Sequence, residues 1–215
     1  MLKFSWFEKK HTPSPANIDL AFMKKNCRIL FIDDHDVPLI ITLKNEGWCV
    51  DYWEDVKRMS DLESGQYDLI FLDIGGVGIE YSPKEEGLGI LRRLKDANPS
   101  VLVIAYSSQE YDFEKQKFYE IADAKLSKSS GALQAMSTIE ELLKKKWTIE
   151  HQLENIETIL LLSKVEKKQI EAIKTILITK HDTKKFDSAI KGLKISGTVI
   201  TIVTKIAYLI MSFYK

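Results

Sequence analysis

The sequence predicts an α/β fold, a doubly wound five-stranded parallel sheet, followed by an all-α segment. Three observations support this prediction. Short apolar runs alternate with helical patterns over residues 28–130, the central runs are continuous Ile, Leu and Val stretches, and Gly and Pro are absent from residues 132–191. Continuous apolar runs indicate strands that are buried on both faces, as in parallel sheets covered by helices. A segment rich in Glu, Lys, Leu and Ile without Gly or Pro favours long helices.

Five segments are predicted to be strands. The most apolar are RILFI at 28–32, YDLIFLDI at 67–74 and VLVIAYSS at 101–108, and the shorter ones are CVDYWED at 49–55 and AKLSKSS at 124–130. Helical patterns separate them, and most of these patterns end at Gly or before Pro, where a helix is expected to stop. The predicted helices are residues 38–48, 56–65, 86–99 and 113–122.

Charge is distributed unevenly along a chain whose formal net charge is zero. Residues 25–131 carry 13 Lys and Arg against 20 Asp and Glu, whereas residues 132–215 carry 14 against 9. This contrast predicts an acidic domain over 25–131 and a basic helical module over 132–215. Residues 1–24, with prolines at 13 and 15, are expected to be an N-terminal tether.

The two cysteines, Cys27 and Cys49, border apolar runs and do not have the spacing of metal ligands. Reduced thiols of this kind favour a cytoplasmic setting. The opening residues lack the apolar core of a signal peptide, which is consistent with that expectation.

Polar side chains follow four of the predicted strands where each strand ends. They are Asp33 and Asp34, Asp73, Ser107 and Lys128. Because the carboxyl ends of parallel strands meet at one edge of a sheet, these side chains are expected to lie close together. Adjacent carboxylates that are partly buried require a compensating cation, and oxygen ligands suit Mg²⁺. A lysine at the same edge could also hold a phosphoryl oxygen.

At this point the chain resembles a response-regulator receiver domain of two-component signalling. The resemblance covers residues 27–131 and rests on FIDD, DLIFLD, EGLGILRRLK, VIAYSS and ADAKLSKS, which occur in the family's order. It implies the flavodoxin-like receiver fold. It also implies that Asp73 accepts a phosphoryl group, and that Asp33, Asp34, Asp73 and the carbonyl of Gly75 hold Mg²⁺.

The resemblance further implies roles for Ser107, which would report the phosphoryl group, and for Lys128, which would pair with a phosphoryl oxygen. The expected partner is a histidine kinase or a phosphotransfer protein. Beyond self-phosphorylation and dephosphorylation at Asp73, no independent enzyme activity is expected.

The sequence departs from the family's pattern in three places. The loop over residues 74–86 is longer and richer in Gly than usual, Ser129 follows Lys128 where the family usually has proline, and Lys125 stands where a switch aromatic is frequent. These departures keep an alternative open: a receiver-like adaptor that docks a partner protein without being phosphorylated.

The last segment, residues 195–214, has an apolar seam at helical spacing. The seam consists of Ile195, Val199, Ile202, Ile206, Leu209 and Phe213. Its length is sufficient to reach across a bilayer, but Lys205 near the centre makes a lone spanning helix costly. The sequence leaves two interpretations open, a helix buried in a bundle or a self-association interface, and a helix in contact with a membrane.

The predicted function is that of a response regulator with a non-DNA-binding output, delivered by oligomerisation or membrane contact of the helical module. Transcription regulation through DNA is a weaker alternative. No arginine follows Arg93, and Arg is the commonest reader of base edges, so binding to nucleic acid is not expected.

Overall fold

A computed structural model describes residues 18–108 and 120–214 and confirms the predicted fold class. Five strands form one sheet in the order β2-β1-β3-β4-β5, and each paired strand is parallel to its neighbour. The strands are β1 (Arg28–Ile32), β2 (Cys49–Trp53), β3 (Leu69–Asp73), β4 (Leu102–Ser107) and β5 (Ala124–Ser127). This order is that of the flavodoxin-like doubly wound fold.

Side chains of the central strands alternate between two apolar cores. One core contains Ile29, Phe31, Leu69 and Phe71, and the other contains Leu30, Ile32, Ile70 and Leu72. In the first core Phe31 and Phe71 stack with ring centroids 4.2 Å apart. Because consecutive strand residues point to opposite faces, a continuous apolar run is needed to fill both cores.

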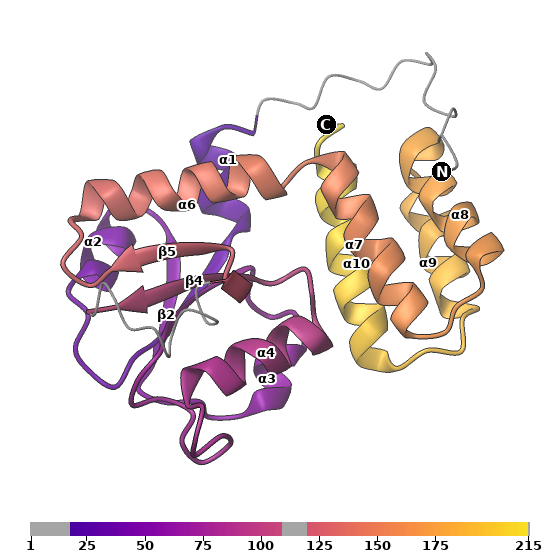
Figure 1. Cartoon of the computed structure of the whole chain (residues 1–215). Coiled ribbons are helices and arrows are strands. Elements are labelled where there is room, and N and C mark those ends of the chain that lie inside the picture. Colours follow the sequence, from indigo (N-terminus) through magenta and orange to yellow (C-terminus); the bar gives the residue numbers. More distant parts are fainter. Residues whose placement is uncertain (1–17, 109–119, 215) are drawn as a thin grey trace, which may run out of the picture.

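Helices cover both faces of the sheet (Figure 1). On one side lie α1 (Leu20–Asn26), α2 (Leu39–Asn45) and α6 (Ala132–Lys146), and on the other lie α3 (Met59–Glu63) and α4 (Gly87–Ala97). α2 and α3 are each followed by a glycine with positive φ, Gly47 at +89° and Gly65 at +78°, where a side chain would be strained. The helix predicted over 113–122 lies largely outside the described residues.

Two segments pack differently from what the expected domain boundaries imply. Residues 20–26, of which most were assigned to the tether, form α1, whose start is capped by the Asp19 carboxylate at 2.7 Å from the Phe22 amide. α6, assigned to the helical module, packs on α2 and β5 and thereby covers the sheet. α6 packs there because its apolar face needs burial: Ala135, Ile139 and Leu143 are fully buried in the sheet-side core.

The remaining helices form a bundle beside the sheet (Figure 1). They are α7 (Ile149–Leu162), α8 (Lys167–Thr175), η2 (Ile176–Lys180), α9 (Thr183–Lys191) and α10 (Gly197–Ser212). At the starts of α7, α9 and α10, side-chain oxygens accept hydrogen bonds from backbone amides. These oxygens belong to Thr148, Asp182 and Ser196. Such caps satisfy amides that have no partner within the helix, and so they fix where each helix begins.

α10 supplies much of the apolar interior of the bundle and packs mainly on α7. Its buried residues are Ile202, Val203, Ile206, Ala207, Ile210 and Met211. The segment 195–214 therefore lies in a bundle, one of the two interpretations that the sequence left open. Within the described part of the chain, no helix has the length and apolar character that crossing a membrane requires.

We expect Leu160→Ala to lower the free energy of unfolding by about 2–5 kcal/mol, because it leaves a cavity where α7 packs in the bundle. Leu160 is 0% exposed, whereas Leu162, two residues later in α7, is 65% exposed. Leu162→Ala is the matched control and should change the free energy of unfolding by less than about 0.5 kcal/mol. Urea denaturation followed by circular dichroism measures both, and equal effects would contradict this packing.

Candidate functional site

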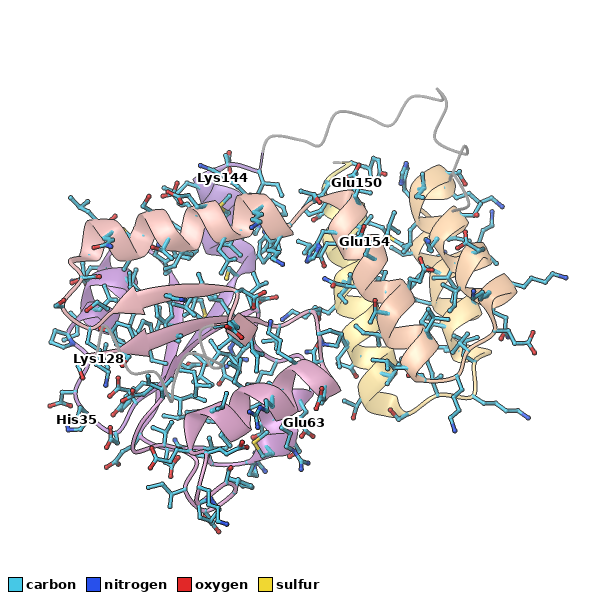
Figure 2. All side chains as sticks on the ribbon, viewed as in Figure 1. His35, Glu63, Lys128, Lys144, Glu150 and Glu154 are labelled. Carbon is cyan, nitrogen blue, oxygen red and sulfur yellow. The ribbon has the colours of Figure 1, made fainter. Side chains whose placement is uncertain are left out.

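The candidate site lies at the carboxyl edge of the sheet. Asp33 follows β1, Asp73 is the last residue of β3, Ser107 is the last residue of β4, and Lys128 follows β5. Figure 2 shows Lys128 and His35 at the end of the sheet that is farthest from the helical bundle. The parallel arrangement brings these residues to one edge, as the sequence predicted.

Lys128 is placed between two carboxylates. Its Nζ is 2.6 Å from Asp73 Oδ2, to which it donates a hydrogen bond, and 2.7 Å from Asp33 Oδ2. The backbone amide of Lys128 donates to the Ser107 carbonyl at 2.9 Å, which fixes the start of the loop after β5. The next peptide bond, to Ser129, is trans, and the Ser129 amide donates to Ser127 Oγ at 3.2 Å.

Asp73 is largely buried, and both of its carboxylate oxygens have donors. Oδ2 accepts from Lys128, and Oδ1 accepts from the Ile74 amide at 2.7 Å and from the Gly75 amide at 3.4 Å. Ser107 is 6% exposed and ends β4 beside Asp73, since Tyr106 and Asp73 are paired between β4 and β3. Asp73 is therefore fixed in orientation by the main chain that follows it.

The electrostatics of the site show an excess of negative charge. Burial raises the pKa of the Asp33 carboxyl, against the opposing effect of the Lys128 ammonium. Burial alone would lower the pKa of Lys128, but the hydrogen bonds and charges of Asp33 and Asp73 outweigh it and raise that pKa. Burial and then the charge of Asp33 raise the pKa of the Tyr106 hydroxyl. One ammonium thus serves two carboxylates, and a further cation would be favourable here.

Asp34 is oriented differently from Asp33. Its side chain is 35% exposed, and Oδ1 lies 2.7 Å from Nδ1 of His35. Ligand atoms of Asp33, Asp34 and His35 lie within 4.8 Å of one another, a grouping that differs from the expected trio of Asp33, Asp34 and Asp73. His35 directly follows Asp34 in the sequence, but nothing in the sequence indicates that its ring contacts the Asp34 carboxylate.

The long loop over residues 74–86 is fixed against the site by two carboxylates that the sequence analysis did not identify. The Gly76 amide donates to Glu86 Oε2 at 3.0 Å, and the Gly78 amide donates to Asp55 Oδ1 at 2.6 Å. Gly76 has a φ of +82°, and a Cβ there would lie 2.4 Å from Asp34 Oδ2. The loop backbone therefore packs directly against the Asp34 carboxylate, and only glycine fits.

The donor set fits Mg²⁺ better than a softer metal. Asp33, Asp34 and Asp73 offer carboxylate oxygens, and Gly75 lies two residues after Asp73. Mg²⁺ prefers few carboxylates with water completing its octahedral shell. The excess of negative charge described above would be balanced by such an ion. His35 is engaged with Asp34 and would position this ligand.

Comparison of the sequence with protein-family models and with curated proteins gives no match. Comparison of the fold with solved structures finds receiver domains. The chemotaxis response regulator CheY4 of Vibrio cholerae is 16% identical, with 54% of this chain and 98% of that chain covered and a TM-score of 0.45. A CheY-like receiver domain protein of Methanospirillum hungatei is 23% identical, with 55% and 94% covered and a TM-score of 0.46.

A third similar structure is NtrX from Brucella abortus, described in complex with ATP. It is 18% identical, and the alignment covers 71% of this chain but 35% of that chain, with a TM-score of 0.47. The strand order β2-β1-β3-β4-β5 itself is that of the flavodoxin-like doubly wound fold, and further helices follow the sheet.

We expect Lys128→Met to lower the free energy of unfolding in the absence of Mg²⁺ by about 1–3 kcal/mol, because Asp33 and Asp73 lose the ammonium between them. The loss should shrink as the pH falls, since burial raises the pKa of the Asp33 carboxyl and a proton on that group relieves the repulsion. Denaturant unfolding in EDTA measures it. Lys84→Met, at an exposed lysine of the long loop, is the control and should have little effect. A loss that grows toward low pH would contradict this assignment.

Proposed function

We propose that the chain is a phosphorylation-dependent signalling protein in which Asp73 accepts a phosphoryl group from a histidine kinase or a phosphotransfer protein. The observation that supports the proposal most directly is the Lys128 ammonium held at 2.6–2.7 Å from both Asp73 and Asp33. This arrangement places a positive charge beside the proposed nucleophile, with a second carboxylate available for a metal ion. A cytoplasmic location belongs to the same proposal.

The chemistry that this site could perform is the transfer of a phosphoryl group. A carboxylate oxygen of Asp73 would form a bond to phosphorus while the bond from phosphorus to the donor breaks, and the donor leaves with that electron pair. Lys128 is placed to neutralise charge on the phosphoryl oxygens of the loose transition state. Asp33 and Asp34 would hold Mg²⁺ together with Asp73 and the Gly75 carbonyl, and the bound ion would supply further charge neutralisation. The Ser107 hydroxyl is proposed to report the result.

A second candidate, a non-phosphorylated adaptor, is favoured by the way the site is covered. Both oxygens of Asp73 already have donors, Asp34 is held by His35, and the Gly76 backbone packs on Asp34. In an adaptor, these hydrogen bonds and contacts would stabilise one rigid surface at the carboxyl edge, and the partner would be a protein that recognises that surface. Oligomerisation of the helical module as the output also remains a proposal.

The first test is chemical labelling of Asp73. With a small phosphodonor and Mg²⁺, we expect the wild type to gain an acid-labile phosphoryl group and Asp73→Asn to lose this labelling entirely, because the amide is not a nucleophile of comparable strength. Asp36→Asn, at an exposed carboxylate just outside the site, is the matched control and should be labelled like the wild type. Labelling that persists in Asp73→Asn would remove the assignment, and absence of labelling in the wild type would favour the adaptor.

The second test is metal binding. Calorimetry should detect Mg²⁺ binding at millimolar concentration, and Asp34→Ala should abolish it while leaving the fold intact, because Asp34 is partly exposed. His35→Ala should weaken the binding less than Asp34→Ala, since His35 only orients the ligand. A wild type that binds no Mg²⁺ at this concentration would count against phosphoryl transfer.

A further inference from the structure

Lys205 is the single charge in the middle of the most apolar helix, and neither the fold class nor the proposed function accounts for it. In the structure its side chain leaves the bundle and reaches the amino edge of the sheet. Nζ lies 2.8 Å from Asp68 Oδ1 and donates to the Gly65 carbonyl at 2.8 Å. These contacts join α10 to the loop between α3 and β3, 140 residues apart in the chain.

Asp68 is built into the sheet rather than exposed on its surface. It directly precedes β3, its side chain is 13% exposed, and its Oδ2 accepts the Arg28 amide at 2.9 Å. Its backbone also bonds to Arg28 and Leu102, on the two strands that flank β3. Burial raises the pKa of the Asp68 carboxyl, and the Lys205 charge is the largest effect that opposes this rise. The Lys205 ammonium therefore favours the charged form of Asp68, together with the amide and the charge of Arg28.

The rest of the contact at this end is small. A Cβ on Gly65 would lie 3.1 Å from Ile202 Cγ1, so the backbone of the loop and α10 approach each other closely. Beside this contact is a cavity of about 280 Å³ whose lining includes Asn26, Tyr67, Asp68, Gln152 and Lys205. The bundle helices pack chiefly on one another and not along the strands.

The other end of the junction is apolar and tightly packed. The Phe22 ring of α1 contacts Trp147, at the turn between α6 and α7, with centroids 6.4 Å apart. It also contacts Phe213, at the end of α10, with centroids 6.0 Å apart. Trp147 and Phe213 are 4% and 5% exposed, and the chain crosses from the sheet to the bundle at this point. We call these three aromatic residues the hinge.

We propose that the ion pair of Lys205 with Asp68 is a latch, which holds the helical bundle against the amino edge of the sheet and, when broken, lets the bundle swing about the hinge without unfolding. At the latch end the sheet and the bundle are joined by one ion pair and one close contact beside an open cavity. This is far less than a continuous apolar interface provides, and domains joined by small interfaces move by default. The latch needs no phosphoryl group and so goes beyond the proposed function.

Cys27 directly precedes β1 at the amino edge of the sheet, near Asp68 and Lys205, and is the reporter that we propose for this motion. Cys27 is 1% exposed, whereas Cys49 is exposed, and these are the only two cysteines. Burial raises the pKa of the Cys27 thiol, and the charges of Asp68 and Lys205 are close enough to act on it. Removing Lys205 would raise that pKa further and slow the reaction of the thiol. Faster labelling of Cys27 would therefore report exposure and not altered acidity.

The experiment compares the full-length wild type with Lys205→Met, without any phosphodonor, by N-ethylmaleimide labelling and mass spectrometry. We expect Cys27 to be labelled about tenfold faster or more in Lys205→Met, since a loss of about 1.4 kcal/mol in the closed state corresponds to that factor. Cys49 is the internal reference and should be labelled at an unchanged rate. X-ray scattering of the same samples should show a larger radius of gyration, while far-UV circular dichroism stays the same.

Two further variants separate the latch from a general loss of stability. Lys205→Arg keeps the charge and should behave like the wild type, and Lys191→Met removes an exposed lysine at the end of α9 and should also stay closed. Wild-type labelling of Cys27 and an unchanged radius of gyration in a folded Lys205→Met would overturn the proposal. If Lys205→Met does not fold, a salt series on the wild type decides: Cys27 labelling that stays flat up to about 1 M NaCl would also overturn it, because screening must weaken this partly exposed pair.

Discussion

All five strands run in one direction, and this constraint determines which charged groups meet at each of the two edges of the sheet. Parallel strands bring their carboxyl ends to one edge and their amino ends to the opposite edge. The carboxyl edge collects Asp33, Asp73 and Lys128, three groups that lie far apart in the sequence. The amino edge presents Asp68 to α10. β3 carries a carboxylate at each of its ends, and in both cases a lysine from a distant segment neutralises it.

The packing that supports these edges depends on period-two alternation in the central strands. Because neighbouring side chains enter different cores, the strands cannot shift by one residue without exchanging the two interiors. This fixed register positions the strand ends, and the loops after them then need only short-range contacts. The Ile74 amide that bonds to Asp73 and the Ser107 carbonyl that accepts the Lys128 amide are contacts of this kind.

The sequence was sufficient for the sheet and for the residues that meet at its carboxyl edge, since apolar runs end visibly on Asp33, Asp73 and Lys128. The sequence does not predict hydrogen bonds and ion pairs between groups that only the path of the chain brings together. Nothing near Gly76 indicates that Glu86 accepts its amide, because such a bond depends on the path of the loop. Likewise, Lys205 was recognisable as an unusual charge in an apolar helix, but its partner Asp68 could be identified only from the way α10 lies beside the sheet. A stretch without Gly or Pro likewise does not show which helix covers which surface, so the packing of α6 on α2 and β5 is visible only in the structure.

A single apolar cluster runs from one face of the sheet through α6 and the hinge into the interior of the bundle. A cut after residue 131 would strip α6 from the sheet, and a cut after α6 would expose Trp147. The sheet domain and the bundle are thus connected by apolar packing at α6 and the hinge, unlike modules that recombination can exchange freely, and substitutions at this connection are constrained by both parts. Gene fusion or shuffling at this boundary would have to preserve the hinge, and the bundle is therefore expected to evolve together with the sheet domain.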